Sequence, residues 1–238
     1  MRKFPGFIVF MAGKCARLVV AGVCAMIAVG AAAQKAKTPT ELSMEKQGMV
    51  EISKVDSTIA VSLMYARADN FTGRVLYTDL HHAYLHPRAA SALKKAQQIL
   101  RRTHPNLTLK VYDAARPMSV QQKMWNVVAG TPKDIYVSNP AHGGGLHNYG
   151  LAVDITIADA HGDSIPMGTR IDNMTALAHI TAEDELVRQH RLTARTVANR
   201  RLLRSVMRQA GFRALHSEWW HFNYTSRANA KKYYKVIK

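Results

Sequence analysis

Apolar residues recur at helical spacing in two long stretches of the chain. Between Pro87 and Thr103 they return every three or four residues, which is the period of a helix with one buried face. Proline is favoured in the first helical turn, so this helix should begin at Pro87. A second stripe, closed by Gly211, predicts a helix over 193–210. The two stripes are Ala89, Leu93, Ala96, Ile99 and Leu100, and Leu203, Val206, Met207 and Ala210.

Outside these helices, other segments have a period of two or are extended, which indicates β-strands. Leu107, Leu109 and Val111 alternate with polar residues and predict one strand. A second strand is expected over 151–157, and the aromatic stretch 212–224 is expected to be extended as well.

A helix and a long, glycine-containing loop are predicted between the first two strands. A helix over 119–128, with Ser119 as its N-cap, should follow the first strand. The segment 130–145 predicts a long loop, and loops of this length in compact domains often carry function. Strands and helices alternate irregularly, with no phosphate-binding glycine loop between a strand and a helix. The sequence therefore predicts an α+β fold, with helices packed on a small, mainly antiparallel β-sheet in a single domain over 51–238.

The first 33 of the 238 residues have the layout of a secretory signal. A basic start is followed by an apolar stretch that ends in Ala31-Ala-Ala33, without an acidic residue. We therefore predict a cleaved signal peptide over 1–33, a polar lead-in over 34–50, and a periplasmic location. The alternative is a retained membrane anchor. Lys14 and Arg17 keep each apolar part below the roughly 20 residues of a spanning helix, so no stable membrane insertion is expected after cleavage.

Cysteine usage limits the chemistry of the exported chain. Both cysteines, Cys15 and Cys24, lie in the predicted signal peptide. The mature chain would therefore have no disulfide and no thiolate, and its possible metal ligands are His, Asp and Glu.

The chain is strongly basic, with a formal net charge of +17, of which the predicted signal peptide carries four charges. Much of the remaining +13 lies between Arg188 and Arg213. A basic cluster can bind nucleic acid, but export argues against such a partner. We expect the arginines to form the solvated face of the helix over 193–210, and no nucleic-acid partner.

Two short motifs offer metal ligands. His147-Asn-Tyr-Gly-Leu-Ala-Val-Asp154 and Glu218-Trp-Trp-His221 together supply two imidazoles and one carboxylate. Three such ligands with an open fourth position are typical of a catalytic zinc site. Asp154 lies in an otherwise apolar strand, where a lone charge is costly and a cation would offset the cost. We therefore predict a zinc site at His147, Asp154 and His221; the alternative for Asp154 is an ion pair with an arginine.

Two further residues would complete a hydrolytic site. Glu218 offers a carboxylate beside the last ligand that can accept a proton from an attacking water. On a regular strand Glu218 and His221 would point to opposite faces, so a bulge or a turn must bring both to the metal. Arg116 follows the first predicted strand, where its guanidinium can stabilise an oxyanion. The alternative is a structural pair between Arg116 and Asp113.

These motifs resemble those of the zinc D-Ala-D-Ala peptidases, and within them the VanX-type D-alanyl-D-alanine dipeptidases. The resemblance extends over most of the mature chain. The segments that carry it are 65–73 (Tyr-Ala-Arg-Ala-Asp-Asn-Phe-Thr-Gly), Asp113-Ala-Ala-Arg-Pro117, the run ending at Asp154, Pro166-Met-Gly-Thr-Arg-Ile-Asp172, 199–204 and Glu218-Trp-Trp-His-Phe222.

The resemblance implies roles for individual residues. One zinc ion per chain would be bound, with Glu218 as the acid/base and Arg116 polarising the scissile carbonyl. Tyr65 and Asp113 would shape the substrate pocket. The implied zinc ligands are those already predicted, namely His147, Asp154 and His221.

Two positions depart from the family pattern. Gly145 stands where the family usually has a serine, so a hydroxyl that could touch the substrate is missing. Pro166 stands where some members have an acidic residue, which leaves open the group that would bind the substrate ammonium.

The resemblance implies hydrolysis of D-Ala-D-Ala, a small D,D-dipeptide, to two D-alanines in cell-wall turnover or scavenging. Such an enzyme should have a small, enclosed cavity that excludes longer peptides. The alternatives are a peptidoglycan D,D-carboxypeptidase or L-Ala-D-Glu endopeptidase with the same zinc site, and a non-catalytic envelope-binding module.

Overall fold

The computed structural model describes residues 36–238, and the predicted signal peptide lies outside them. The helices are α1 (Pro39–Lys46), α2 (Ile52–Val55), α3 (Pro87–Thr103), α4 (Met118–Val128), α5 (Glu183–Arg188), α6 (Ala194–Gln209) and α7 (Arg227–Tyr233). The strands are β1 (Val50–Glu51), β2 (Ala60–Val61), β3 (Tyr84–Leu85), β4 (Thr108–Asp113), β5 (Ala152–Ala158), β6 (Arg213–Leu215) and β7 (Glu218–Asn223). Short 3₁₀ helices include η1 (Met64–Ala66), η2 (Asp134–Tyr136), η3 (Pro140–His142) and η4 (Leu146–Tyr149).

A five-stranded sheet with the strand order β2-β4-β5-β7-β6 forms the centre of the fold. β2 runs parallel to β4, and the other neighbouring strands are antiparallel. Every residue of β5 is buried, as expected for a strand covered on both faces. The predicted α+β fold with a small, mainly antiparallel sheet in a single domain is confirmed.

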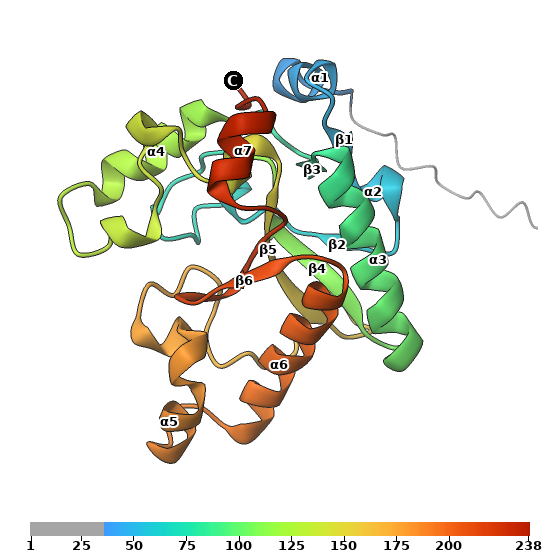
Figure 1. Ribbon diagram of the computed structural model, residues 1–238, viewed down its shortest axis with the longest axis vertical. Coiled ribbons are helices and arrows are strands. Elements are labelled where there is room, and N and C mark those ends of the chain that lie inside the picture. Colours follow the sequence, from blue (N-terminus) through green and yellow to red (C-terminus); the bar gives the residue numbers. More distant parts are fainter. Residues whose placement is uncertain (1–35) are drawn as a thin grey trace, which may run out of the picture. The chain divides into compact units, whose positions relative to one another are not determined.

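Two long helices pack beside this sheet. α3 and α6 contact each other, and they also contact β4 and β6, respectively (Figure 1). Their buried faces contain the predicted apolar stripes. Thr193 caps α6 by accepting a hydrogen bond from the Thr196 backbone N–H. In the same view α4 lies on the other side of β5 from α3.

The lead-in predicted over 34–50 is part of the domain. α1 begins with a capping box, in which Thr38 and Glu41 bind each other's backbone N–H groups. Met44 is fully buried in the core, and Val50 pairs with Leu85 between β1 and β3. A few apolar side chains thus anchor this otherwise polar segment, which forms one compact unit with the rest of residues 37–238.

The N-cap predicted at Ser119 is wrong. α4 begins at Met118, and Pro117 holds the cap position with a φ of −58° and a ψ of 146°. Proline fixes φ close to this value, so the chain enters the helix two residues earlier than a cap at Ser119 would require. Ser119 is exposed in the first turn.

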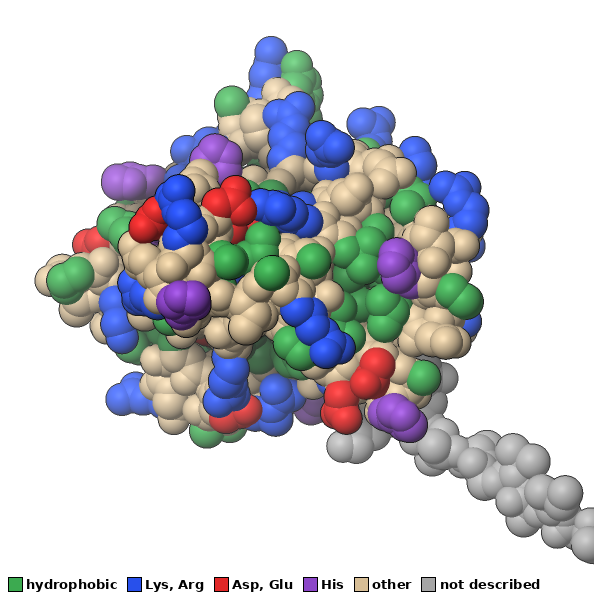
Figure 2. Space-filling model, turned by 90° about the horizontal axis from the view of Figure 1, so that it is seen from below, with side chains coloured by type: hydrophobic (Ala, Val, Ile, Leu, Met, Phe, Trp, Pro, Cys, Tyr) green, Lys and Arg blue, Asp and Glu red, His purple; other side chains and the backbone are tan. Residues whose placement is uncertain are grey.

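The arginines of α6 are only partly solvated, which corrects the prediction of a uniformly wet face. Arg200 is fully buried and donates a hydrogen bond to the Met167 carbonyl. Arg204 pairs with Glu183 of α5. On the face shown in Figure 2, Lys and Arg side chains are spread among neutral, apolar and a few acidic ones. Among residues 36–238, no helix has the length and apolar character needed to cross a membrane.

Candidate active site

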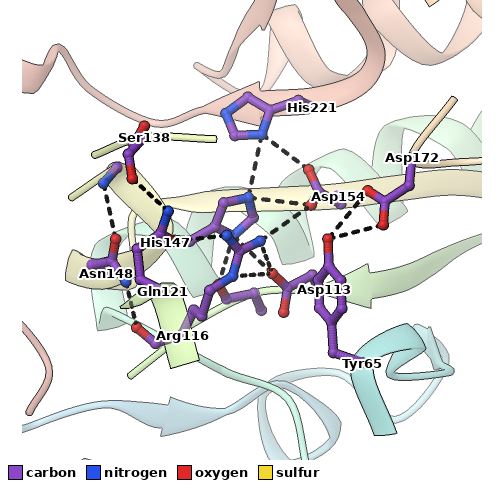
Figure 3. Close-up of polar contacts among 12 residues, drawn as sticks. Tyr65, Asp113, Arg116, Gln121, Ser138, His147, Asn148, Asp154, Asp172 and His221 are labelled. Carbon is purple, nitrogen blue, oxygen red and sulfur yellow. Dashed lines mark hydrogen bonds and ion pairs between the residues drawn. The ribbon is translucent and has the colours of Figure 1, made fainter. Parts of the chain in front are cut away.

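Three side chains from separate elements converge on one point of the sheet. His147 comes from η4, Asp154 from β5 and His221 from β7 (Figure 3). One ligand atom of each lies within 4.8 Å of the others. Asp154 and His221 are direct partners in the antiparallel pairing of β5 with β7. The structure thus brings together the three predicted ligands, which are 74 residues apart at most.

A tight turn connects the first two of these residues. η4 ends at Gly150, whose φ of 64° is in the left-handed region that favours glycine. A Cβ atom at this position would lie 2.7 Å from Met49 Sδ and 2.9 Å from the His86 backbone nitrogen. Glycine is therefore required at residue 150 both by the turn and by the close approach of the chain.

Hydrogen bonds fix which nitrogen of each imidazole faces the cluster. His147 Nδ1 lies 2.7 Å from the Ala114 carbonyl, which can only accept, so Nδ1 carries the proton. His221 Nε2 lies 2.9 Å from Asn223 Oδ1 and donates to it. Both remaining nitrogens, His147 Nε2 and His221 Nδ1, therefore present lone pairs to the cluster.

The distances within the cluster fit a zinc ion. His147 Nε2 is 3.2 Å from His221 Nδ1 and 3.3 Å from Asp154 Oδ2, and His221 Nδ1 is 2.9 Å from Asp154 Oδ1. Tetrahedral zinc with bonds of about 2.1 Å separates neighbouring ligand atoms by about 3.4 Å. Two lone pairs and a carboxylate so close together repel one another unless a cation lies between them. The donor set therefore suits zinc.

A β-bulge brings Glu218 to the same cavity as His221. Ala214 pairs with Phe222, but Leu215 pairs with Glu218, so three residues of β7 have no partner in β6. This is the irregularity that the three-residue spacing requires, and Glu218 and His221 both line the cavity. Burial raises the pKa of Glu218 to about 7, with help from the negative charges of Asp154 and Asp172. Such a carboxylate is suited to exchange protons near neutral pH.

Arg116 is held rigidly while it lines the same cavity. Its Nε donates to Asp113 Oδ2 at 2.9 Å, and its Nη1 donates to Gln121 Oε1 at 2.9 Å. Its backbone N–H donates to the His147 carbonyl at 3.0 Å. The structural pair with Asp113 and the chemical role are therefore compatible, because the pair orients the guanidinium toward the ligand cluster.

The two residues expected to shape the pocket have different positions. Tyr65 lines the cavity and donates its hydroxyl to Asp172 at 3.0 and 3.1 Å. Asp113 is fully buried and does not line the cavity. It accepts hydrogen bonds from Arg116 and Tyr77, so its contacts orient the arginine and do not form a pocket wall.

The cavity around these residues has a volume of about 410 Å³. This lies toward the small end of the roughly 300–1,000 Å³ found for small-molecule sites. The loop predicted over 130–145 supplies one wall through Tyr136, Val137 and Ser138. His142, in the same loop, is exposed and is not one of the clustered ligands.

Comparison with known proteins identifies the family. A family model described as D-ala-D-ala dipeptidase matches residues 45–238. The chain belongs to this family. It is 33% identical over 174 residues to the D-alanyl-D-alanine dipeptidase of Escherichia coli K12, which covers 73% of this chain and 83% of that protein. It is 29% identical over 160 residues to the corresponding Synechocystis protein, covering 55% of this chain and 65% of that one.

A solved structure of VanYB in complex with D-alanine-D-alanine is a more distant match. It shares 17% identity with a TM-score of 0.35, covering 63% of this chain and 76% of that one. The family membership thus comes from sequence, and it makes the chain a metallopeptidase.

This dipeptidase-family chain has one acidic residue in the cavity that sequence reasoning did not single out. Asp172 lines the cavity, whereas Pro166 lies outside it and borders a different one. Removal from water raises the pKa of Asp172 to about 7, and the charge of Asp154 adds to this effect. Its φ of 62° is left-handed, a conformation that Asp tolerates better than most residues. Its place at the end of the Pro166–Asp172 motif was the only signal in the sequence.

Proposed function

We propose that the protein is a zinc-dependent dipeptidase that hydrolyses D-Ala-D-Ala to two D-alanines. The names of its curated relatives support this substrate. The observation that carries the proposal is the carboxylate of Asp172 in the cavity that holds the ligand cluster. A carboxylate so close to the reacting centre suits a substrate whose free ammonium is one residue from the scissile bond. A carboxypeptidase acting on long peptides would instead need an open path at this end.

His147, Asp154 and His221 would hold the zinc ion. When bound, zinc supplies a Lewis acid that polarises the scissile carbonyl and activates water. Glu218 accepts the proton of the attacking water and passes it to the leaving amine. Arg116 stabilises the negative charge that develops on the carbonyl oxygen. Asp172 binds the substrate ammonium, and the Tyr65 hydroxyl orients that carboxylate.

The location proposed for this activity is the periplasm, in cell-wall turnover or scavenging of D-alanine. The predicted signal peptide over 1–33 supports it. N-terminal sequencing of the protein recovered from a periplasmic fraction should begin near Gln34. Recovery of the intact N-terminus from the membrane fraction would contradict this location and favour a retained anchor.

The activity is tested by comparing three substrates with the zinc-loaded protein. D-Ala-D-Ala should release D-alanine, whereas N-acetyl-D-Ala-D-Ala, which lacks the ammonium, should be cleaved at least a hundredfold more slowly. A muropeptide ending in D-Ala-D-Ala should not be cleaved. Release of D-alanine from the muropeptide alone would overturn the proposal in favour of a D,D-carboxypeptidase.

The variant Glu218→Gln tests the mechanism within the same assay. It should lower kcat by about 10²–10⁴, the usual contribution of a positioned general base. It should still bind one zinc ion per chain, because Glu218 is not one of the clustered ligands. Unchanged turnover in this variant would exclude Glu218 as the base.

A further inference from the structure

Gly145 is not required by its own backbone. Its φ of −105° and ψ of −177° are extended values that any residue adopts. The reason for glycine lies in its surroundings. A Cβ atom at this position would lie 2.8 Å from Ser138 Oγ and 3.2 Å from Ser138 Cβ. The side chain of Ser138 therefore occupies the space into which a side chain at residue 145 would extend.

Ser138 lines the cavity together with Gly145 and His147. Its carbonyl accepts a hydrogen bond from Gln121 Nε2 at 2.7 Å. Gln121 is buried and also binds Arg116, so the backbone of Ser138 is tied through one side chain to the guanidinium. Among the described residues 36–238, the hydrogen bonds of Ser138 involve its carbonyl and leave its hydroxyl available to a ligand.

Ser138 and Asp172 lie on opposite sides of the ligand cluster. Figure 3 shows Ser138 on one side of His147 and Asp154, and Asp172 on the other. The contacts of Arg116 agree with this view. Its Nη1 binds Gln121, on the Ser138 side, and its guanidinium lies 5.2 Å from the ring centre of Tyr65, on the Asp172 side.

The two ends of a dipeptide differ in charge, which sets its direction in this cavity. If Asp172 binds the ammonium, the scissile carbonyl lies at the ligand cluster and the C-terminal carboxylate points toward Ser138. We infer that the Ser138 hydroxyl donates a hydrogen bond to the C-terminal carboxylate of the substrate and thereby selects a free carboxylate at that end. The inference rests on the proposed dipeptidase function. It makes Ser138 a specificity residue. Its hydroxyl comes from the 130–145 loop and lies beside Gly145 in the cavity wall.

Kinetics with a charged and a neutral C-terminus test this assignment. Ser138→Ala should raise KM for D-Ala-D-Ala roughly tenfold to hundredfold, the effect of a hydrogen bond to a charged group. Its kcat should change less than about threefold, because the carbonyl bond to Gln121 is kept. KM for D-Ala-D-Ala amide, which has no carboxylate, should be almost the same in Ser138→Ala and in the wild type. Equal KM values for the acid substrate would overturn the inference.

A reciprocal exchange tests whether residues 138 and 145 share one space. Gly145→Ser alone should impair binding, because its Cβ would collide with Ser138. Ser138→Gly removes the colliding atoms, so the double variant Ser138→Gly/Gly145→Ser should bind D-Ala-D-Ala several-fold more tightly than Ser138→Gly. No gain in the double variant would contradict the shared space.

Two controls separate this inference from folding and from the proposed function. Ser119→Ala, an exposed serine on α4, should leave both KM values unchanged. The dissociation constant of D-Ala-D-Ala, measured by calorimetry on zinc-loaded Glu218→Gln with and without Ser138→Ala, reports binding without turnover. Wild-type protein that neither cleaves nor binds the dipeptide would defeat the proposed function. Wild-type cleavage with an unaffected Ser138→Ala variant would defeat only the role of Ser138.

Discussion

At the residue scale, the site depends on carboxylates that differ in what they bind. Asp154 faces two imidazole nitrogens, Asp113 is bound by Arg116 and Tyr77, and Asp172 is bound by Tyr65. For Glu218, burial raises the pKa to about 7 and outweighs the lowering effect of His221 and Arg116. In the proposed mechanism these environments suit the four acidic side chains to four tasks: metal ligand, orienting group, ammonium site and base.

The raised pKa of Glu218 predicts how kcat/KM falls at low pH. A base acts when deprotonated, so kcat/KM should be full above about pH 7 and fall as the pH drops through that value. The charge of Asp172 contributes to this raised pKa. Asp172→Asn should therefore shift the midpoint of this fall to lower pH, besides weakening substrate binding. A pH profile of kcat/KM measures the shift, and an unmoved midpoint would mean that another group titrates.

The contacts of Arg116 predict that lysine cannot replace it. One guanidinium binds Asp113 and Gln121 at once and still lines the cavity, whereas an ammonium offers no such planar fork. Arg116→Lys should lower kcat by about 10²–10³ with zinc content unchanged. Arg101→Lys, on the exposed face of α3, is the matched control and should have no effect. A wild-type kcat in Arg116→Lys would assign the arginine to structure alone.

At the scale of elements, the sequence predicts features that depend on neighbouring residues in the chain, and it does not locate features that depend on distant ones. The bounds of α3 and α6 follow from apolar periodicity and their caps, and the structure has them within one residue or so. The spacing of Glu218 and His221 predicts that β7 is irregular, but not where, because the position of the bulge depends on how β6 pairs with β7. Asp172 and Ser138 belong to loops. Only folding brings Asp172 to Tyr65, more than 100 positions earlier in the chain, and Ser138 against Gly145, seven positions later. No period or motif spacing records such contacts.

The turn between η4 and β5 predicts a difference between two glycines. Gly48 and Gly150 both have positive φ values, of 83° and 64°. Nothing lies within 4 Å of a Cβ at Gly48, so Gly48→Ala should cost only the backbone strain of roughly 1–2 kcal/mol. Gly150→Ala adds a collision with the His86 backbone and should destabilise the fold clearly more.

Denaturant unfolding of the two glycine variants, together with zinc titration, measures this difference. Gly150→Ala should also weaken zinc binding, because the turn sets His147 against Asp154. Gly48→Ala should bind zinc like the wild type. Equal loss of stability in the two variants would show that the turn relaxes without moving the ligands.

At the scale of the whole molecule, the cluster joins segments that lie far apart in the chain. β5 and β7 carry Asp154 and His221, η4 carries His147, and the turn at Gly150 packs on Met49 near the start of the domain. The N-terminal segment that looks separable in sequence therefore supports the wall of the site. Truncation at residue 51 would remove α1 and the buried Met44 and Met49, so the domain should be produced from residue 36 or earlier.

The same convergence predicts that zinc stabilises the entire fold. A ligand that binds only the folded state raises stability by about 4 kcal/mol at a free concentration of 1,000 times its Kd. For a domain of this size such a gain raises Tm by roughly 10 °C. A chelator should therefore lower Tm by about that amount, and added zinc should restore it. Glu218→Gln should show the same shift, because it keeps all three ligands, whereas His147→Ala should show almost none. A chelator that leaves the wild-type Tm unchanged would contradict zinc binding at this cluster.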